Sequence, residues 1–249
     1  MKLALVIPIH DFKRLFSSPL PWLILACVQF LLGIFFYLLL SRYMESTALY
    51  ASRGITEVVI VGVLQIAGVL MLLISPFVTM RFFSDELRSG TIKLLLSSPA
   101  SVTSIVLGKY LAVMSYYCLI AVAIALMPAS LAAGTSLDSG LLFSGFLGLL
   151  MLFSVFACIG LFFSSLNHSP PMAAISSFLF SFLLWISHIT SDTENPQVEA
   201  LANYVSLQKH FNAMLSGAFN TSDLAFFFLS SLLFLALCIW RLDRVRTHQ

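Results

Sequence analysis

The sequence is poor in charged residues. Asp, Glu, Lys and Arg make up 10% of its 249 residues, whereas 59% are hydrophobic. Soluble globular domains carry about 25% charged residues, so the composition excludes that class. The alternating segments of about ten residues that build a transmembrane β-barrel are also missing. The composition therefore predicts an all-α integral membrane protein, with a single transmembrane domain over residues 1–249.

Motifs for catalysis, cofactor binding and metal binding are absent as well. Gly108-Lys109 lacks the upstream glycine and the following hydroxyl of a phosphate-binding P-loop. The segment 134–138 lacks the second glycine of a serine nucleophile elbow. The cysteines stand singly in apolar runs, without metal or redox spacing, and are predicted to be packing residues: Cys27, Cys118, Cys158 and Cys238. We therefore expect no catalytic residue, no cofactor and no metal site, which argues against an enzyme.

Six apolar stretches approach or exceed the roughly 20 residues that cross a bilayer as a helix. They are expected at about 20–40, 58–80, 105–127, 141–163, 172–189 and 224–240. No acidic or basic residue lies deep within any of them. Loop Lys and Arg residues set the orientation, because they collect on the cytoplasmic side. With six spans and the N-terminus inside, only Arg42, Arg53 and Lys209 fall outside, so both termini are predicted to be cytoplasmic.

The segment between the second and third spans combines charge with helical periodicity. Apolar residues at three- and four-residue steps share one side of a helix, and the charged residues fall largely on the other. This pattern predicts an amphipathic helix over about 84–96 with Ser84 as its N-cap. One interpretation is a helix lying among the lipid headgroups. The other is a helix that docks a soluble protein, and the near balance of acids and bases favours it, since lipid-seeking helices are rich in Lys and Arg.

Two further segments and two glutamines are candidates for special roles. Residues 3–18 form an amphipathic lead-in that we expect to lie along the membrane surface. The outer segment of about 201–223 is predicted to form either a helical cap or a re-entrant hairpin. Gln29 and Gln65 lie deep enough in their spans to need hydrogen-bond partners, supplied either by another helix or by a substrate.

Three motifs resemble those of the permease subunits of type-2 ABC exporters, with the strongest likeness to the gliding-motility-type (GldF-like) group. The motifs are FKRLFSSPL at 12–20, SDELRSGTIKLLL at 84–96 followed by Pro99 and Leu107-Gly108-Lys109, and HF at 210–211 with SGAFNTSDL at 216–224. The likeness covers nearly the whole chain, and the second motif is the most specific. Lys93 and Leu87 depart from the usual charge pattern of that motif.

The resemblance implies a multi-pass permease of the bacterial cytoplasmic (inner) membrane that is driven by a separate ATPase. The expected assembly holds two ATPase subunits and a second permease chain, which is either identical to this one or a sibling. An accessory periplasmic-facing subunit is a further candidate partner. Membrane lipid is expected around the complex, and nucleic acid is not an expected partner. The implied coupling surface consists of Asp85, Glu86, Arg88, Gly90, Thr91, Leu94, Leu95 and Leu96. The implied interface helix beside it carries Asp11, Phe12, Arg14 and Phe16. The outer segment would be a re-entrant cap.

Three functions remain open at this point. The chain exports a solute, or it transmits force to periplasmic partners without moving a solute, or it is a membrane scaffold without an ATPase. Spans without charged residues fit a lipid-like cargo and force transmission equally well. The cargo, the direction of transport and the composition of the dimer do not follow from the sequence.

Overall fold

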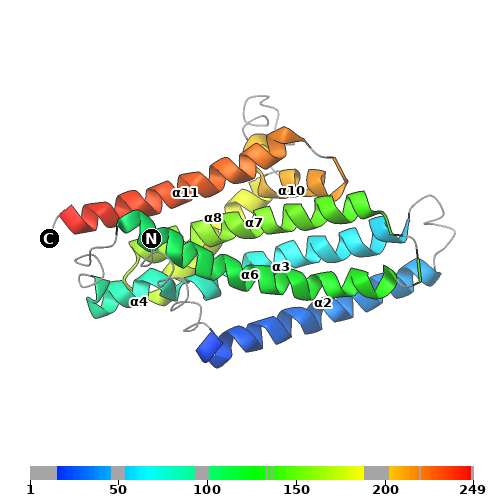
Figure 1. The fold of residues 1–249 in the computed structure, drawn as a ribbon, viewed down its shortest axis with the longest axis horizontal. Helices are drawn as coiled ribbons and strands as arrows, with labels where there is room; N and C mark the ends of the chain where they lie inside the picture. Colours follow the sequence, from blue (N-terminus) through cyan, green and yellow to red (C-terminus); the bar gives the residue numbers. More distant parts are fainter. Residues whose placement is uncertain are drawn as a thin grey trace.

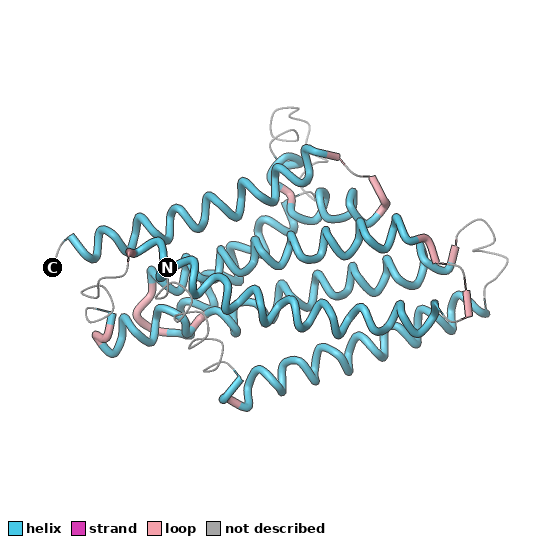
Figure 2. The backbone as a smooth tube through the Cα atoms, in the orientation of Figure 1, coloured by secondary structure: helices cyan, strands magenta, loops and turns pink. Residues whose placement is uncertain are grey.

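A computed structural model describes residues 16–45, 54–92, 101–132, 134–135, 137–187, 202–218 and 220–247. All regular structure in these ranges is helical, which confirms the all-α prediction for them (Figures 1 and 2). The helices are α2 (Pro19–Glu45), the π-helical turn η1 (Thr56–Ile60), α3 (Val61–Thr79), α4 (Arg81–Ser89), α6 (Val102–Ala132), α7 (Ser139–Leu166), α8 (Pro170–Ile186), α10 (Leu207–Leu215) and α11 (Thr221–Thr247).

Five of these helical segments are long and apolar enough to cross a membrane: Pro19–Glu45, Thr56–Ser89, Val102–Leu131, Ser139–Leu166 and Thr221–Thr247. The expected fifth span is the shorter apolar helix α8, which has 17 residues. A helix of that length is about 25 Å long, slightly less than the ~30 Å of a typical hydrocarbon core. The multi-pass prediction is therefore confirmed, and the count of six crossings is not.

The helices extend beyond the predicted spans at most of their ends. The third and sixth spans were predicted at 105–127 and 224–240, whereas α6 and α11 cover Val102–Ala132 and Thr221–Thr247. Hydropathy detects only the part of a helix that matches the hydrocarbon, while hydrogen bonding continues the helix into the polar layer. Local caps set where the helix starts and stops: Asp138 is the N-cap of α7, and its Oδ1 accepts hydrogen bonds from the backbone N–H groups of Gly140 and Leu141.

Helix α7 is the centre of the bundle, and α3, α4, α6, α8, α10 and α11 all pack against it (Figure 1). Every residue from 152 to 161 is buried, so this stretch is enclosed on all sides. In Figure 1, α4, the connection between α7 and α8, and the C-terminal end of α11 lie at one end of the bundle, while the connection between α6 and α7 lies at the other.

Small residues allow neighbouring helices to approach α7 closely, as is common in membrane bundles. At Gly160, an added Cβ atom would lie 2.1 Å from Oγ1 and 2.7 Å from Cβ of Thr79 in α3. Thr79 is fully buried and its hydroxyl donates to the carbonyl of Ser75, so it has no room to move away. The packing of α3 on α7 therefore requires glycine at position 160.

We predict that Gly160→Ala destabilises the protein by about 1–3 kcal/mol, because the new methyl group overpacks the α3–α7 contact. The measurement is the thermal unfolding midpoint of the purified chain in detergent. Gly33→Ala is the matched control, since Gly33 lies within α2 and a Cβ there meets nothing within 4 Å. Equal midpoints for the two variants would contradict the prediction.

Candidate functional site

The junction between α3 and α4 is held by a side chain from another helix. Ser164 of α7 accepts hydrogen bonds through Oγ from the backbone N–H groups of Phe83 (3.0 Å) and Ser84 (3.2 Å) and donates to the carbonyl of Met80 (2.8 Å). These N–H groups belong to the first turn of α4, where a helix leaves its amides without internal partners. Ser164 therefore caps α4 from α7, at the point where α3 leads into α4.

The predicted cap at Ser84 is wrong, and Gly90 interrupts the helix predicted over 84–96. Ser84 is not the N-cap, because α4 begins at Arg81 and the Ser84 hydroxyl donates back to the carbonyl of Met80. Helix α4 ends at Ser89, because Gly90 adopts a left-handed conformation with φ 73°, and residues 93–96 of the predicted helix lie outside the described residues. Such a residue terminates a helix, and glycine adopts it without steric penalty.

The end of α4 presents a small polar surface. Arg88, Ser89, Gly90 and Thr91 are exposed, and the Ser89 hydroxyl lies 2.8 Å from that of Thr91. Asp85, Glu86 and Leu87 are half-buried on the same helix. We call Arg88, Ser89, Gly90 and Thr91 the α4 tip. The structure thus brings most of the predicted coupling residues to one end of the bundle. Those of the α4 tip are exposed, and Asp85 and Glu86 are half-buried.

The remaining predicted residues of this surface fall outside the described residues. These are Leu94, Leu95 and Leu96 of the central segment, and Asp11, Phe12 and Arg14 of the lead-in. Phe16, the last residue predicted for the interface helix, is described. Its ring packs edge-on against Trp22 of α2 and Tyr116 of α6, with centroids 5.4 Å and 5.9 Å apart.

A buried ion pair links α4 to α6. The Lys109 ammonium lies 2.5 Å from Oε1 of Glu86 and donates to the carbonyl of Phe82 at 2.8 Å. It also lies 5.0 Å from the ring centroid of Phe83 and 5.8 Å from that of Phe82, within the range of cation–π attraction. The Lys109 side chain is 2% exposed and that of Glu86 17%. Sequence reasoning placed Glu86 on a docking surface and assigned Lys109 no partner.

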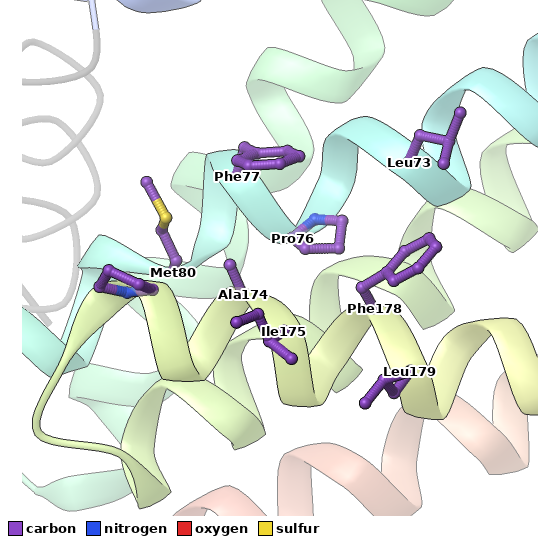
Figure 3. A pocket seen from close by; sticks show the side chains of 9 residues that line it. Leu73, Pro76, Phe77, Met80, Ala174, Ile175, Phe178 and Leu179 are labelled. Carbon is purple, nitrogen blue, oxygen red and sulfur yellow. The ribbon is translucent and has the colours of Figure 1, made fainter.

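An uncharged groove of about 560 Å³ runs between α3 and α8. Figure 3 shows the side chains that line it from the two helices: Leu73, Pro76, Phe77 and Met80 of the α3 segment, and Pro171, Ala174, Ile175, Phe178 and Leu179 of α8. Along α3, the exposed residues Gln65, Val69, Leu73 and Phe77 recur at four-residue steps and therefore share one face. This α3–α8 groove is apolar over its full length.

The outer segment packs into the bundle through α10. Phe211 of α10 is fully buried and lies against Gly68 of α3 and Gly148 of α7, where an added Cβ would come within 2.9 Å and 3.6 Å of its ring. Gly148 is nine residues inside α7, about 13 Å from the helix start. The described part of the predicted segment 201–223 therefore reaches well into the bundle from the end opposite α4.

Both singled-out glutamines donate hydrogen bonds to other helices. Gln29 Nε2 of α2 lies 3.0 Å from the carbonyl of Ala123 in α6. Gln65 Nε2 of α3 lies 3.3 Å from Oδ1 of Asn212 in α10 and stays exposed. The Gln65–Asn212 pair thus places polar groups on the same face of α3 that continues into the α3–α8 groove, at the end away from α4.

A histidine joins α10 to the start of α11. His210 Nδ1 lies 2.6 Å from Oδ1 of Asp223, and Nε2 lies 3.0 Å from the carbonyl of Tyr204. The ring stacks on Phe226 at 4.1 Å between centroids. Both ring nitrogens thus face oxygen atoms of neighbouring residues. This pair fixes the outer segment against the last span.

The described residues hold no group of three or more His, Cys, Asp or Glu side chains suited to a metal ion. Their polar groups build interhelical contacts and one exposed tip, rather than a constellation for bond-making chemistry. Comparison with known protein families gives a match over residues 5–246 to the family described as ABC-2 family transporter protein. No curated protein matches the chain.

Replacing Gly90 should fray the last turn of α4. Any L-residue with a side chain is disfavoured at φ 73°, by roughly 1–2 kcal/mol, while the position itself offers open space. We expect Gly90→Ala to raise amide exchange in the last turn of α4 by about tenfold, and Gly90→Asn to raise it less, since Asn tolerates this conformation. Gly54→Ala, also in open space but without a positive φ, is the control. Unchanged amide exchange in Gly90→Ala would refute the role of Gly90 as the left-handed residue that ends α4.

Proposed function

Because the chain belongs to the ABC-2 family of transporter proteins, we propose that it is the permease subunit of a type-2 ABC exporter, worked by a separate ATPase subunit. The family match covers nearly the whole chain and supports a multi-pass membrane component of an ABC transporter. The sequence has no P-loop of its own, so ATP hydrolysis falls to another chain. The GldF-like group is the subgroup that the three sequence motifs favour.

The observation that carries the proposal is the α4 tip. It combines a cation, hydroxyl groups and an exposed backbone on a segment that follows directly from the second candidate span. A soluble ATPase bound there would move α3 with it. Coupling requires that the ATPase contacts differ between its two nucleotide states, which makes α4 the element whose position follows ATP binding.

The proposed orientation places the α4 end of the bundle in the cytoplasm of a bacterium. Arg81, Arg88 and Lys109 gather at this end, and so do Arg241, Arg244 and Arg246 of α11. Lys and Arg residues near the ends of membrane spans mark the cytoplasmic side. The arrangement requires α8 to cross as the fifth of six spans, since α7 and α11 both run toward the α4 end of the bundle and end there (Figure 1).

We place the second permease chain across the α3–α8 groove, with the cargo route between the two chains. Two observations support this placement: the groove is open and uncharged, and Gln65 is exposed in an otherwise apolar span above it. An uncharged lining suits a lipid-like molecule rather than an ion or a sugar. Force transmission to a periplasmic partner is the alternative that the same lining permits.

Reversing the charge of the α4 tip should weaken ATPase binding. We expect Arg88→Glu to reduce by about tenfold or more the ATPase subunit that co-purifies with the chain, since a charged interface contact contributes about 1.5–3 kcal/mol. Lys209→Glu makes the same charge change on an exposed residue of α10 and should leave co-purification intact. Equal recovery of the ATPase by both variants would rule out docking at the α4 tip.

Cysteine labelling tests the sidedness. In a chain without its native cysteines, Ser89→Cys and Ser216→Cys place single thiols at exposed positions of α4 and after α10. A membrane-impermeant maleimide added to intact spheroplasts should label position 216 and not position 89, and the pattern should reverse in inside-out vesicles. Labelling of both positions from one side would exclude the six-crossing arrangement.

A further inference from the structure

Lys109 is unusual in being a fully buried lysine at the end of a span. Lysines near helix ends normally extend their ammonium group to the interface. Here the ammonium instead turns into the protein and meets the Glu86 carboxylate, the Phe82 carbonyl and two aromatic rings. Burial of a lone ammonium is strongly unfavourable, so this set of contacts is what holds the charge in place.

The ion pair connects two helices whose backbones otherwise barely meet. Helix α4 packs mainly on α7 and, to a lesser extent, on α8. Its direct polar link to α6, among the contacts described, is the long side chain of Lys109, which spans the gap between them. Ser164 fixes the start of α4 from α7, and Lys109 fixes a point farther along from α6. Two neighbouring helices thus restrain α4 at two positions.

The second restraint sets the rotation of α4 about its own axis. Successive residues of an α-helix are rotated by about 100°, so Glu86 and Arg88 point in nearly opposite directions. With the Glu86 carboxylate drawn inward to Lys109, Arg88 must face outward, as its exposure shows. A rotation that exposed Glu86 would turn Arg88 toward the bundle and would leave the buried ammonium without its carboxylate.

We propose that the Glu86–Lys109 pair is a strut that fixes the rotation of α4 and joins α4 to α6, so that Glu86 and Lys109 are positioning residues and not part of the docking surface itself. The consequence for coupling rests on the proposed function: an ATPase that displaces the α4 tip would move the third span together with the second. A buried ion pair is weak support for stability alone, and specificity of arrangement is the role proposed for this one.

The first test uses the purified chain without any partner and measures amide exchange by mass spectrometry. Glu86→Gln and Lys109→Met each remove one charge of the pair, and each should raise exchange in α4 by about tenfold or more while α11 stays unchanged. Arg81→Gln is the matched control, because it removes an exposed cation from the same helix. If both single variants leave α4 as protected as in the wild type, the strut does not exist.

The second test separates positioning from stability. The double variant Glu86→Met/Lys109→Met replaces the ion pair by apolar side chains of similar length, which should return the unfolding midpoint toward that of the wild type. The double variant also allows the role of the ion pair to be tested if either single variant fails to fold. If the strut positions α4, this double variant binds the co-purifying ATPase yet loses at least about half of the ATP hydrolysis that the wild-type chain supports. Full hydrolysis in the double variant would make the pair merely structural and overturn the proposal.

The outcomes distinguish the strut from the proposed function. If the wild-type chain binds no ATPase while the single variants still expose α4, the strut is retained and the exporter assignment fails. If an ATPase binds and responds to Arg88→Glu while α4 exchange ignores Glu86 and Lys109, the exporter assignment is retained and the strut fails. Each result therefore decides between the two statements.

Discussion

The burial of α7 on every side is the constraint on which the rest of the structure depends. Ten consecutive residues, 152 to 161, are all buried within the protein. In a bilayer the apolar side chains of such a helix gain little from leaving lipid, so association relies on close packing and on hydrogen bonds between helices. Gly145, Gly148 and Gly160 supply the close approach, toward Leu64, Met214 and Thr79 respectively.

Hydroxyl groups supply the hydrogen bonds between α7 and its neighbours. Ser154 of α7 lies 2.8 Å from the Tyr110 hydroxyl of α6 and 2.9 Å from the Ser231 hydroxyl of α11, so one side chain connects three helices. Ser144 donates to the carbonyl of Met214 near the start of α7, and Ser164 caps α4 near its end. The same helix thus holds both α10 and the start of α4. A movement of α10 relative to α4 therefore has to change contacts that both make with α7.

The parts of this fold that follow from sequence are those that depend on composition over a window. Long apolar runs predict the candidate spans, because nothing except a helix satisfies the backbone in hydrocarbon. The charged interval between Met80 and Ile105 predicts an exposed segment at a bundle end for the same reason. Gly90 carried the signal for the end of α4, since glycine is the common residue just after a helix, and periodicity alone extended the helix too far.

The parts that sequence does not reveal depend on contacts between distant residues. Ser84 followed by two acids has the local pattern of an N-cap, yet Ser164, 80 positions later, takes that role from α7. Lys109 near a span end reads as an interfacial cation, and only the fold shows that it turns toward Glu86. Residue identity decides that a charge needs a partner, while the packing of α4 beside α6 decides which partner it finds.

The helical segment Thr56–Ser89 has 34 residues and is about 51 Å long, well beyond the ~30 Å of the hydrocarbon core. Ser164 is hydrogen-bonded to this segment at Met80. About 14 Å of helix lies between Met80 and Ser89, and about 36 Å lies between Met80 and Thr56. The segment is also held on both sides of that point, by the packing of Thr79 on Gly160 and by the Glu86–Lys109 pair. Were it to move as one body about Met80, the displacement of Thr56, at the opposite end of the bundle, would be about 2.7 times that of Ser89.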